Sequence, residues 1–286
     1  MSIFDLSGKV ALITGSTRGI GKSIAMQMAL HGARVVVSSR KPESCTEVAA
    51  EIIAAGGMAF PHACHVGDKA QLQTLVDATV AKWGQIDILV CNAAVSPYFG
   101  ASIDMPDDAF EKTIHINLHS NVWLCNMTLP AMAKRKEGVV IIVSSVGGFH
   151  GSALLGAYCI SKAADMQLAR NLAVEWGPQN IRVNCIAPGV IRTRFSEKLW
   201  ADPARAAAFA RRYPLRRLGE PDDVAGTAVL LASRAGNFIT GQTIVVDGGG
   251  LIGEGEPLLY SRFHRSAKAR SCHKSISRVP TSRSQG

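Results

Sequence analysis

Short apolar runs rich in valine and isoleucine alternate along this chain with longer segments in which apolar residues recur at helical spacing. The apolar runs begin at residues 9, 33, 58, 86, 138, 181 and 242 and read KVALITG, ARVVVSS, MAFPHACHV, IDILVCNAA, GVVIIVSS, IRVNCIAPG and QTIVVDGG. The helical segments lie near 19–31, 43–55, 69–83, 107–135, 153–177 and 221–233. Near-continuous apolar strands that alternate with helices predict an α/β fold with a parallel sheet covered on both faces.

Seven such strands fit a doubly wound order within a single domain. Right-handed crossovers then bring the carboxyl ends of the strands to one edge of the sheet, where folds of this kind bind their ligands. The segments that follow the strands are therefore expected to carry the chemistry.

The composition favours a soluble globular protein. The chain has 286 residues, of which 47% are hydrophobic and 19% are charged, and these proportions allow a sizeable core. No apolar run approaches the roughly 20 residues that a membrane span needs, and the sequence MSIFDLSGKV lacks the plan of a secretory signal. We therefore expect a cytoplasmic protein without a membrane partner.

The cysteines give no sign of a metal site. Seven of them are scattered along the chain, with no paired CxxC spacing, at positions 45, 64, 91, 125, 159, 185 and 272. Most lie among apolar residues, where a reduced thiol behaves as a small core side chain. We expect neither disulfides nor a bound metal.

The formal charge of +9 would suggest nucleic acid as a partner if it were spread over the molecule. Residues 251–286, however, hold seven Lys or Arg, two Glu and seven Ser, without a sustained apolar period. We therefore predict a catalytic domain over residues 1–250 and a basic, disordered extension over 251–286. A basic extension can bind polyanions, but we expect no nucleic-acid function.

The first strand runs directly into the glycine-rich sequence TGSTRGIG, with Gly15, Gly19 and Gly21 before a helical segment. Glycines let the backbone turn tightly and approach a pyrophosphate, while the helix N-terminus presents free N–H groups to negative charge. Because this turn follows a strand and opens a helix, it predicts dinucleotide binding.

The end of the second strand indicates which dinucleotide is bound. An NAD-preferring fold of this kind usually places a carboxylate there, on the adenosine ribose. Here the chain reads VVVSSRKPE, so that Ser39 stands in that place and Arg40 follows it, while Arg18 lies inside the glycine turn. An arginine fork suits a phosphate. The pattern favours NADP(H), with NAD(H) as the alternative.

Tyr158 and Lys162 stand four residues apart in the sequence GAYCISKAAD. On a helix they share one face, and an ammonium about 5 Å from a phenol favours the phenolate by about 3 kcal/mol at an effective dielectric near 20. We therefore expect the lysine to lower the pKa of the tyrosine, which would make it a usable proton donor or acceptor. The same spacing also occurs in ordinary surface pairs.

Six ordered motifs make residues 6 to about 250 resemble the short-chain dehydrogenase/reductase family, which has a Rossmann-type fold. The motifs are TGxxxGxG, Asn92 in CNAA, Asn117 in IHINL, Ser145 in IIVSS, Tyr158 and Lys162 in YxxxK, and APG at 187–189. The phrases VVVSSRK, IDILVCNAAV, IRVNCIAPG and RRLGEPDD are also similar to the NADP-dependent carbonyl and retinal reductase branch of that family.

The resemblance implies a role for each of four residues. Tyr158 would be the catalytic acid in reduction and the base in oxidation, and Lys162 would lower its pKa and hold the nicotinamide ribose. Ser145 would hydrogen-bond the substrate oxygen, and Asn117 would complete a proton relay through water. Preorganised donors of this kind stabilise the charge that develops on the oxygen during hydride transfer.

The resemblance also implies a set of cofactor contacts. Besides Tyr158 and Lys162, these are Gly15, Ser16, Thr17, Arg18, Gly19, Ile20, Gly21, Ser39, Arg40, Val66, Asn92, Ala93, Ala94, Pro188, Gly189, Ile191 and Thr193. The sequence departs from the family pattern at Ala94, where glycine is usual, and at His65, where aspartate is usual. We expect the Val66 backbone still to serve the adenine and His65 to be a polar cap of its strand.

The segment from Val190 to Asp223 corresponds to the mobile lid that this family carries over its substrate. Its apolar residues could line a pocket for a hydrophobic or aromatic ketone and alcohol pair, or could only pack the lid on the body. They are Phe195, Leu199, Trp200, Phe209 and Tyr213, joined by Val95, Tyr98 and Phe149. Seven arginines in the same segment could instead recruit an acidic substrate, although solvated arginines are the commoner case.

The resemblance further implies a homodimer or homotetramer, paired through the helices around residues 121–133 and 157–176. The leading functional hypothesis is an NADP(H)-dependent oxidoreductase acting on a small-molecule carbonyl or alcohol. Two alternatives are an NAD(H)-dependent alcohol dehydrogenase of the same family and a nucleotide-sensing protein without catalysis. The presence of all four catalytic residues disfavours the last.

Overall fold

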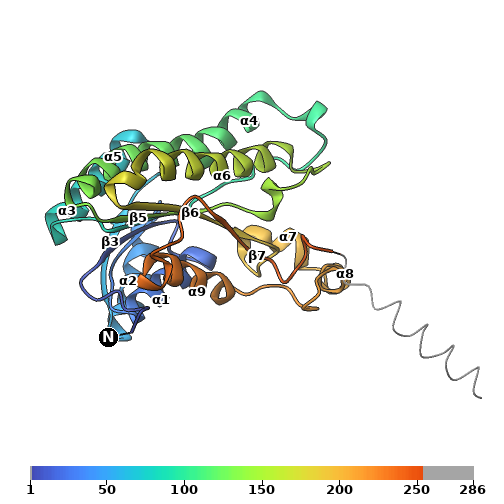
Figure 1. Cartoon of the computed structure of the whole chain (residues 1–286). Coiled ribbons are helices and arrows are strands. Elements are labelled where there is room, and N and C mark those ends of the chain that lie inside the picture. Colours follow the sequence, from blue (N-terminus) through green and yellow to red (C-terminus); the bar gives the residue numbers. More distant parts are fainter. Residues whose placement is uncertain (1, 254–286) are drawn as a thin grey trace, which may run out of the picture.

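A seven-stranded parallel sheet forms the centre of the protein (Figure 1). The computed structural model describes residues 2–253. From residue 254 onward, the predicted extension lies outside the described residues. The strand order is β3-β2-β1-β4-β5-β6-β7, which confirms the predicted doubly wound Rossmann-type fold. The strands are β1 Val10–Thr14, β2 Arg34–Ser39, β3 Met58–Ala63, β4 Ile88–Cys91, β5 Gly138–Val143, β6 Ile181–Pro188 and β7 Thr243–Val246.

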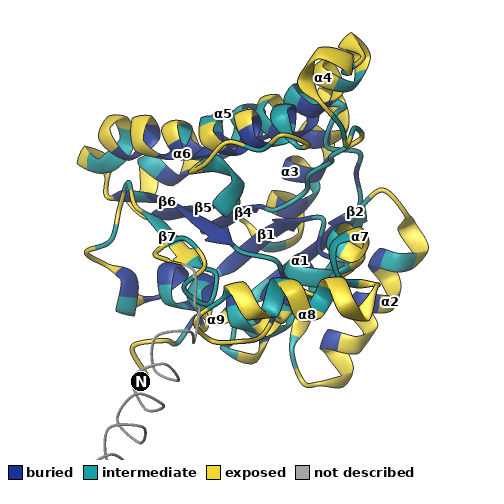
Figure 2. Cartoon of the chain, turned by 90° about the vertical axis from the view of Figure 1, so that its right-hand side faces the viewer, coloured by how far each residue is buried: buried dark blue, intermediate teal, exposed yellow. Residues whose placement is uncertain are grey.

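Helices cover the sheet on both faces, with α1, α2 and α9 on one side and α3, α5 and α6 on the other (Figures 1 and 2). The three on the first side are α1 Gly19–Leu30, α2 Pro42–Ala54 and α9 Pro221–Ala232. Those on the second are α3 Lys69–Trp83, α5 Ser120–Arg135 and α6 Gly156–Trp176. No helix within residues 2–253 is both long and apolar enough to span a bilayer.

The central strands are apolar at nearly every position because both of their faces are buried. All six residues of β5 are buried, as are the five of β1 and the four of β4. The edge strand β3 differs, since none of its residues is fully buried and it contains Pro61. Proline cannot donate to a sheet ladder and is tolerated at an edge. The apolar pattern thus follows position in the sheet.

The predicted helix over 107–135 is interrupted. It consists of α4 Asp107–Ile114, a wide π-helical turn over His115–His119, and α5. Asn117 lies in that turn, and its side chain hydrogen-bonds both main-chain groups of Val95 on a neighbouring loop. Hydrophobic periodicity continues through such a turn, which is why the sequence predicted one uninterrupted helix.

Two short helices form the lid segment, α7 Glu197–Trp200 and α8 Pro203–Arg212. They lie beside the ends of the strands, on the same side of the molecule as α4 (Figures 1 and 2). Asp202 begins α8 by accepting a hydrogen bond from the main-chain N–H of Arg205. The lid thus faces the edge of the sheet where the sequence places the chemistry.

Truncating a core side chain of the central strand should destabilise the protein. Ile141 on β5 is completely buried between the helices and the neighbouring strands. We predict that Ile141→Ala lowers the free energy of unfolding by about 2–5 kcal/mol, because apolar burial is lost and a cavity remains. Ile53→Ala on α2, where the side chain is exposed, should change it by less than about 0.5 kcal/mol. Urea denaturation measures both, and equal effects would contradict the assigned core.

Candidate active site

The glycine positions of the turn between β1 and α1 do not tolerate side chains. Gly15 and Gly19 adopt positive φ angles of +64° and +54°, a region that favours glycine. A Cβ at Gly21 would collide with the Asn92 amide and with the carbonyl oxygen of Gly15, and one at Gly19 would lie 3.0 Å from Thr193. The turn is therefore packed against the loop after β4 and the base of the lid.

The N-terminus of α1 suits a phosphate group. Arg18 occupies the cap position but makes no side-chain capping bond, and the first turn contains no acidic residue. By contrast, Asp68 caps α3 by accepting from Ala70 and Gln71. The first N–H groups of α1 are thus available to an anion. The glycine turn and this helix end fit the pyrophosphate of a dinucleotide.

Thr14 fixes the loop after β4 against the end of β1, a role that the sequence analysis missed. Its hydroxyl accepts hydrogen bonds from the main-chain N–H groups of Asn92 (3.0 Å) and Ala93 (3.1 Å). The Asn92 amide donates to the carbonyl oxygens of Thr14 (2.9 Å) and Gly15 (3.2 Å). Asn92 therefore holds the glycine turn in shape. A threonine at the end of a strand is too common in sequences to have revealed this.

The Ser16 side chain is also used inside the protein. The residue is completely buried, and its hydroxyl donates to the Ile13 carbonyl while accepting from the Ser38 N–H at 2.8 Å in both cases. Its main-chain N–H also donates to the Ser38 carbonyl at 3.1 Å, so Ser16 ties β1 to β2 through both its side chain and its backbone. Thr17 and Ile20, next to it in the turn, are partly exposed.

Arg18 and Arg40 lie at the same edge of the sheet, because β1 and β2 are paired in parallel and each arginine follows one of them. Both are exposed. Ser39 is partly buried, with its main-chain N–H 3.2 Å from the Cys45 sulfur. The end of β2 therefore presents positive charge with a small neutral residue beside it.

Tyr158 and Lys162 lie in the first two turns of α6, next to Ser145 at the end of β5. The Lys162 ammonium is 5.8 Å from the centre of the Tyr158 ring, and Lys162 is 2% exposed. The Ser145 hydroxyl accepts from the Gly147 N–H and lies beside the phenol, where it favours the phenolate. The structure thus brings together the three groups that the sequence predicted as a cluster.

Lys162 acts on Tyr158 in the expected direction, but the pKa of Tyr158 is not lowered overall. Although its ring is partly exposed, burial of the hydroxyl raises the pKa of Tyr158 above its ordinary value, and the charge of Lys162 offsets only part of that effect. Desolvation disfavours the charged form of any group. The attraction of the lysine alone would lower the pKa of Tyr158. Burial and the negative charge of a neighbouring residue, Asp165, both raise it.

Asp165 is a second feature that the sequence analysis missed. Its carboxylate is completely buried and lies 3.0 Å from the Lys162 ammonium. The sequence does contain a signal, since an acidic residue three positions after a lysine lies on the same helix face. That face is the one turned to the sheet.

The Asn117 side chain is fully engaged by the protein. Its amide oxygen accepts from Val95 N–H at 2.8 Å, and its Nδ2 donates to the Val95 carbonyl and to the Ser161 hydroxyl at 2.9 and 3.0 Å. Its main-chain carbonyl accepts from Asn121 at 2.7 Å. Asn117 therefore braces the loop after β4 against α6 through its side chain, and any contact with a relay would use its main chain.

The end of β6 and the base of the lid close the other side of the glycine turn. Pro188 ends β6, and the Gly189 N–H donates to Val246 on β7. Ile191 is buried in the core, whereas Thr193 is partly exposed and contacts the Gly19 position. Ile191 thus anchors the lid, and Thr193 is placed to meet a ligand at the turn.

Of the proposed apolar wall, Phe195 lies nearest the phenol, with its ring centre 5.8 Å from that of Tyr158. Phe195 and Phe149 are each about half exposed. Tyr213 instead braces the lid, because its hydroxyl accepts from the Val190 N–H at 3.0 Å. Of the residues proposed for the apolar wall, Phe195 therefore contacts the phenol ring, while Tyr213 stabilises the lid.

Residues predicted to contact the adenine follow β3 and β4. Val66, Ala93 and Ala94 are all partly buried. The His65 main-chain N–H donates to Gln71, and its ring lies 3.1 Å from the Gly67 N–H. His65 thus stabilises the turn into α3, as expected for a polar cap.

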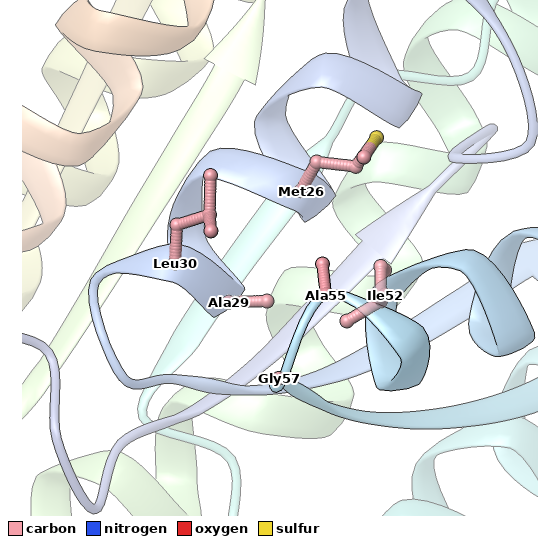
Figure 3. A pocket seen from close by; sticks show the side chains of 6 residues that line it. All are labelled: Met26, Ala29, Leu30, Ile52, Ala55 and Gly57. Atoms are coloured by element: carbon pink, nitrogen blue, oxygen red, sulfur yellow. The ribbon is translucent and has the colours of Figure 1, made fainter.

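Other parts of the described chain offer less chemistry. Residues 2–253 contain no group of His, Cys, Asp or Glu side chains that could hold a metal ion. A small apolar hollow between α1 and α2 is lined by Met26, Ala29, Leu30, Ile52, Ala55 and Gly57 (Figure 3). It lies at the amino-terminal edge of the sheet and contains no titratable side chain, so it is not a candidate active site.

Adding a methyl group at Gly21 should disrupt the turn. We predict that Gly21→Ala lowers the melting temperature and weakens binding of NADPH at least about tenfold, because its Cβ would collide with Asn92 and Gly15. Gly226→Ala on α9, where a Cβ meets nothing within 4 Å, should stabilise the protein by about 0.5–1 kcal/mol. Thermal denaturation and fluorescence titration measure these effects. Unchanged NADPH binding in Gly21→Ala would contradict the assigned turn.

Comparisons with known proteins show the family to which this chain belongs. A protein-family model described as Enoyl-(Acyl carrier protein) reductase matches residues 15–250. "Dehydrogenase/reductase SDR family member 4" of Sus scrofa is 46% identical over 244 residues, which are 85% of this chain and 88% of that protein. The human "Dehydrogenase/reductase SDR family member 2, mitochondrial" is 37% identical over 243 residues, covering 85% and 86% of the two chains.

Two solved structures are similar over nearly their whole length. One is a 7 alpha-hydroxysteroid dehydrogenase complexed with NADH and 7-oxo glycochenodeoxycholic acid, with 37% identity, a TM-score of 0.83, and 88% and 97% of the two chains covered. The other is a putative NAD(P) dependent gluconate 5-dehydrogenase from Beutenbergia cavernae with bound NADP, with 32% identity, a TM-score of 0.84, and 88% and 100% covered. The chain belongs to the short-chain dehydrogenase/reductase family of NAD(P)-dependent oxidoreductases.

Proposed function

We propose that this protein uses NADP(H) to interconvert hydrophobic or aromatic ketones or aldehydes with their alcohols. The observation that carries this proposal is the cluster of Tyr158, Lys162 and Ser145, with an aromatic side chain against the phenol, at the same edge of the sheet as the glycine turn. The family relationship supplies the reaction class, and the residues at the edge of the sheet supply the specificity.

The residues act on the substrate oxygen. The bound nicotinamide supplies a hydride to the carbonyl carbon in reduction and accepts one in oxidation. Tyr158 donates its hydroxyl proton to the oxygen as negative charge develops there, and Ser145 donates a hydrogen bond to the same oxygen. Lys162 stabilises the phenolate that Tyr158 becomes when it has lost its proton. In oxidation Tyr158 takes the proton back.

The raised pKa of Tyr158 suits the reductive direction. Because burial keeps the phenol protonated well above neutral pH, nearly every molecule carries the proton that reduction consumes. Oxidation needs the phenolate, which becomes populated only as the pH rises. We therefore propose that reduction starts from the protonated phenol present at neutral pH and that the rate of oxidation rises with pH.

The preference for NADP(H) rests on charge at the end of β2. Arg18 and Arg40 are exposed, and among the described residues neither makes an ion pair within 4.0 Å. Ser39 takes the place of the carboxylate that would repel a 2′-phosphate. Similar structures hold NADH in one case and NADP in another, so fold similarity alone does not select a cofactor.

The substrate class follows from Phe195 and Phe149. Both are half exposed, and Phe195 lies against the Tyr158 ring. An apolar surface with few polar groups favours hydrophobic or aromatic substrates. A similar steroid dehydrogenase holds a large oxo compound, which is consistent with this class. The lid arginines are partly used within the lid, since Arg192 pairs with Glu220 and Arg217 with Asp223.

We further propose that residues 1–250 act as one catalytic domain and that the protein forms a homodimer or homotetramer. Helices α5 and α6 lie side by side on the outside of the sheet (Figures 1 and 2). Ile160 and Val174 on α6 are 55% and 81% exposed. Apolar side chains on such a surface favour contact with a second copy.

Removing the phenol hydroxyl tests the proposed catalysis. We predict that Tyr158→Phe lowers kcat/KM for reduction of acetophenone, benzil and benzaldehyde with NADPH by about a hundredfold to ten-thousandfold, while NADPH binding is retained. Thr74→Val is the control, because the exposed Thr74 hydroxyl donates to the Ala70 carbonyl within its own helix, α3. Undiminished turnover in Tyr158→Phe would refute the assigned mechanism.

Removing the two arginines tests the cofactor preference. We predict that the wild-type protein favours NADPH over NADH by at least about tenfold in kcat/KM, or about 1.4 kcal/mol. Arg18→Ala/Arg40→Ala should bring that ratio close to one by weakening NADPH alone. Arg34→Ala, at the opposite end of β2 from Arg40, should leave the ratio unchanged. Equal use of both cofactors by the wild-type protein would mean that the arginines have no role in selection.

A further inference from the structure

The carboxylate of Asp165 is completely buried on the inner face of α6, three residues after Lys162. Carboxylates are seldom fully buried unless they are paired and hydrogen-bonded. The family motif contains the tyrosine and the lysine, but the carboxylate is a feature of this chain's own structure. Its contacts show what it can do.

Both carboxylate oxygens accept a hydrogen bond from a buried side chain. The Lys162 ammonium donates to Oδ2 at 3.0 Å, and the Asn121 amide donates to Oδ1 at 3.0 Å. The two helices that carry these residues, α5 and α6, lie side by side (Figure 1). The same Asn121 nitrogen also donates to the main-chain carbonyl of Asn117. Asp165 therefore connects the lysine of the site to the π-helical turn that holds Asn117.

The Lys162 ammonium is held from the inner side. Besides the bond to Asp165, it donates to the Val143 carbonyl at the end of β5 at 2.9 Å. An ammonium has three N–H donors, so two are fixed by the protein and one is left to act toward the phenol and the bound ribose. A lysine anchored in this way is preorganised rather than free to change rotamer.

The charges of the three groups are coupled. Burial raises the pKa of Asp165, while Lys162 and Asn121 oppose that effect. Burial lowers the pKa of Lys162, but the negative charges of Asp165 and Tyr158 more than compensate, so it lies above its ordinary value. The charge of Asp165 also disfavours the phenolate of Tyr158. Lysine and aspartate thus act in opposite directions on the phenol.

We propose that Asp165 is a positioning residue that anchors the Lys162 ammonium and, by its negative charge, sets the pH range in which Tyr158 exchanges its proton. This inference rests on the proposed roles of Tyr158 and Lys162 as a proton-transfer pair. In the motif alone, Lys162 is the residue that adjusts the pKa of Tyr158. We assign part of that adjustment to a third side chain, Asp165.

The other titratable groups around this network are thiols. Cys159 lies on the same helix, Cys185 faces the ion pair from β6 and Cys91 faces it from β4, with Cys125 of α5 against Cys91. Burial raises the pKa of Cys185 and of Cys159. The Cys125 thiol and burial together raise that of Cys91. Burial thus disfavours charge on these three thiols, and Asp165 is the carboxylate of the network.

The test is Asp165→Asn, which removes the charge and leaves one acceptor where Lys162 and Asn121 need two. Loss of the anion lowers the pKa of Tyr158 and also that of Lys162. Both limbs of the pH profile of kcat/KM for oxidation of 1-phenylethanol with NADP⁺ should therefore move to lower pH, by about one pH unit. A profile that does not move contradicts the proposal.

A second readout needs neither cofactor nor turnover. Ultraviolet absorbance of the ligand-free protein follows ionisation of its tyrosines, and subtraction of the same titration for Tyr158→Phe isolates Tyr158. This titration should also shift to lower pH in Asp165→Asn. If the titration shifts but neither the wild type nor any variant is active, the role of Asp165 is supported and the proposed function is refuted. If the enzyme is active but neither pH readout shifts, the proposed function is supported and the role of Asp165 is refuted.

Asp87→Asn is the matched control. Asp87 is another buried carboxylate, 2% exposed, which accepts from Val10 and Gln85 at the amino-terminal edge of the sheet. Its loss should reduce stability but leave both pH readouts unchanged. If Asp87→Asn moves them as far as Asp165→Asn does, the effect is general destabilisation and the proposal is wrong.

Asn121→Asp/Asp165→Asn separates anchoring from charge. The introduced amide accepts from Lys162 and donates to the introduced carboxylate, so the anchoring of the lysine is kept while the negative charge moves farther from it. The hydrogen bond from residue 121 to the Asn117 carbonyl is lost. Both pH readouts should lie between those of the wild type and of Asp165→Asn, with more activity recovered than in the single variant. If neither this variant nor Asp165→Asn yields folded protein, Asp165 is a structural residue and the proposal is wrong.

Discussion

Parallel pairing of β1 with β4, and of β4 with β5, is the constraint on which the site depends. The register pairs Ile13 with Val90 and Val90 with Ile141, so these strands end at the same level. The glycine turn, the loop after β4 and Ser145 therefore meet at one edge. Thr14 strengthens this arrangement, since its hydroxyl joins the end of β1 to the loop after β4. Such junctions between parallel strands are where open α/β sheets bind ligands.

Helix α6 is held on this sheet by polar contacts as well as by apolar packing. The buried Ser144 hydroxyl donates to the Lys162 carbonyl at 2.7 Å, while the Lys162 ammonium reaches back to the Val143 carbonyl. These bonds join the end of β5 to the helix that carries Tyr158. A shift of the helix would break these bonds and leave buried polar groups unsatisfied, which is costly. The bonds therefore restrict the position of the helix. The phenol and the serine hydroxyl thereby keep their relative position.

The site keeps three ionisable side chains together in a largely buried environment. Burial opposes charge on each of them, and only their mutual contacts allow charged forms to persist. A buried ion pair is a weak source of stability, because the cost of desolvation offsets most of the attraction. Its value here is chemical, since it holds one cation at a fixed distance from the phenol. In the proposed mechanism, the balance between burial, the lysine cation and the aspartate anion decides how readily Tyr158 exchanges its proton.

The sequence by itself determined the fold class and most of the members of the site. Continuous apolar runs identify the buried parallel strands, and the glycine turn and the spacing of Tyr158 and Lys162 are local patterns that survive in any tertiary arrangement. Only the tertiary structure decided that Asn117 lies in a π-helical turn with its amide engaged by Val95, and that Asp165 pairs with Lys162. It also decided that burial raises the pKa of Tyr158. These properties depend on desolvation and on contacts between residues that are distant in the chain. Burial and contacts of this kind form only when the helices pack on the sheet.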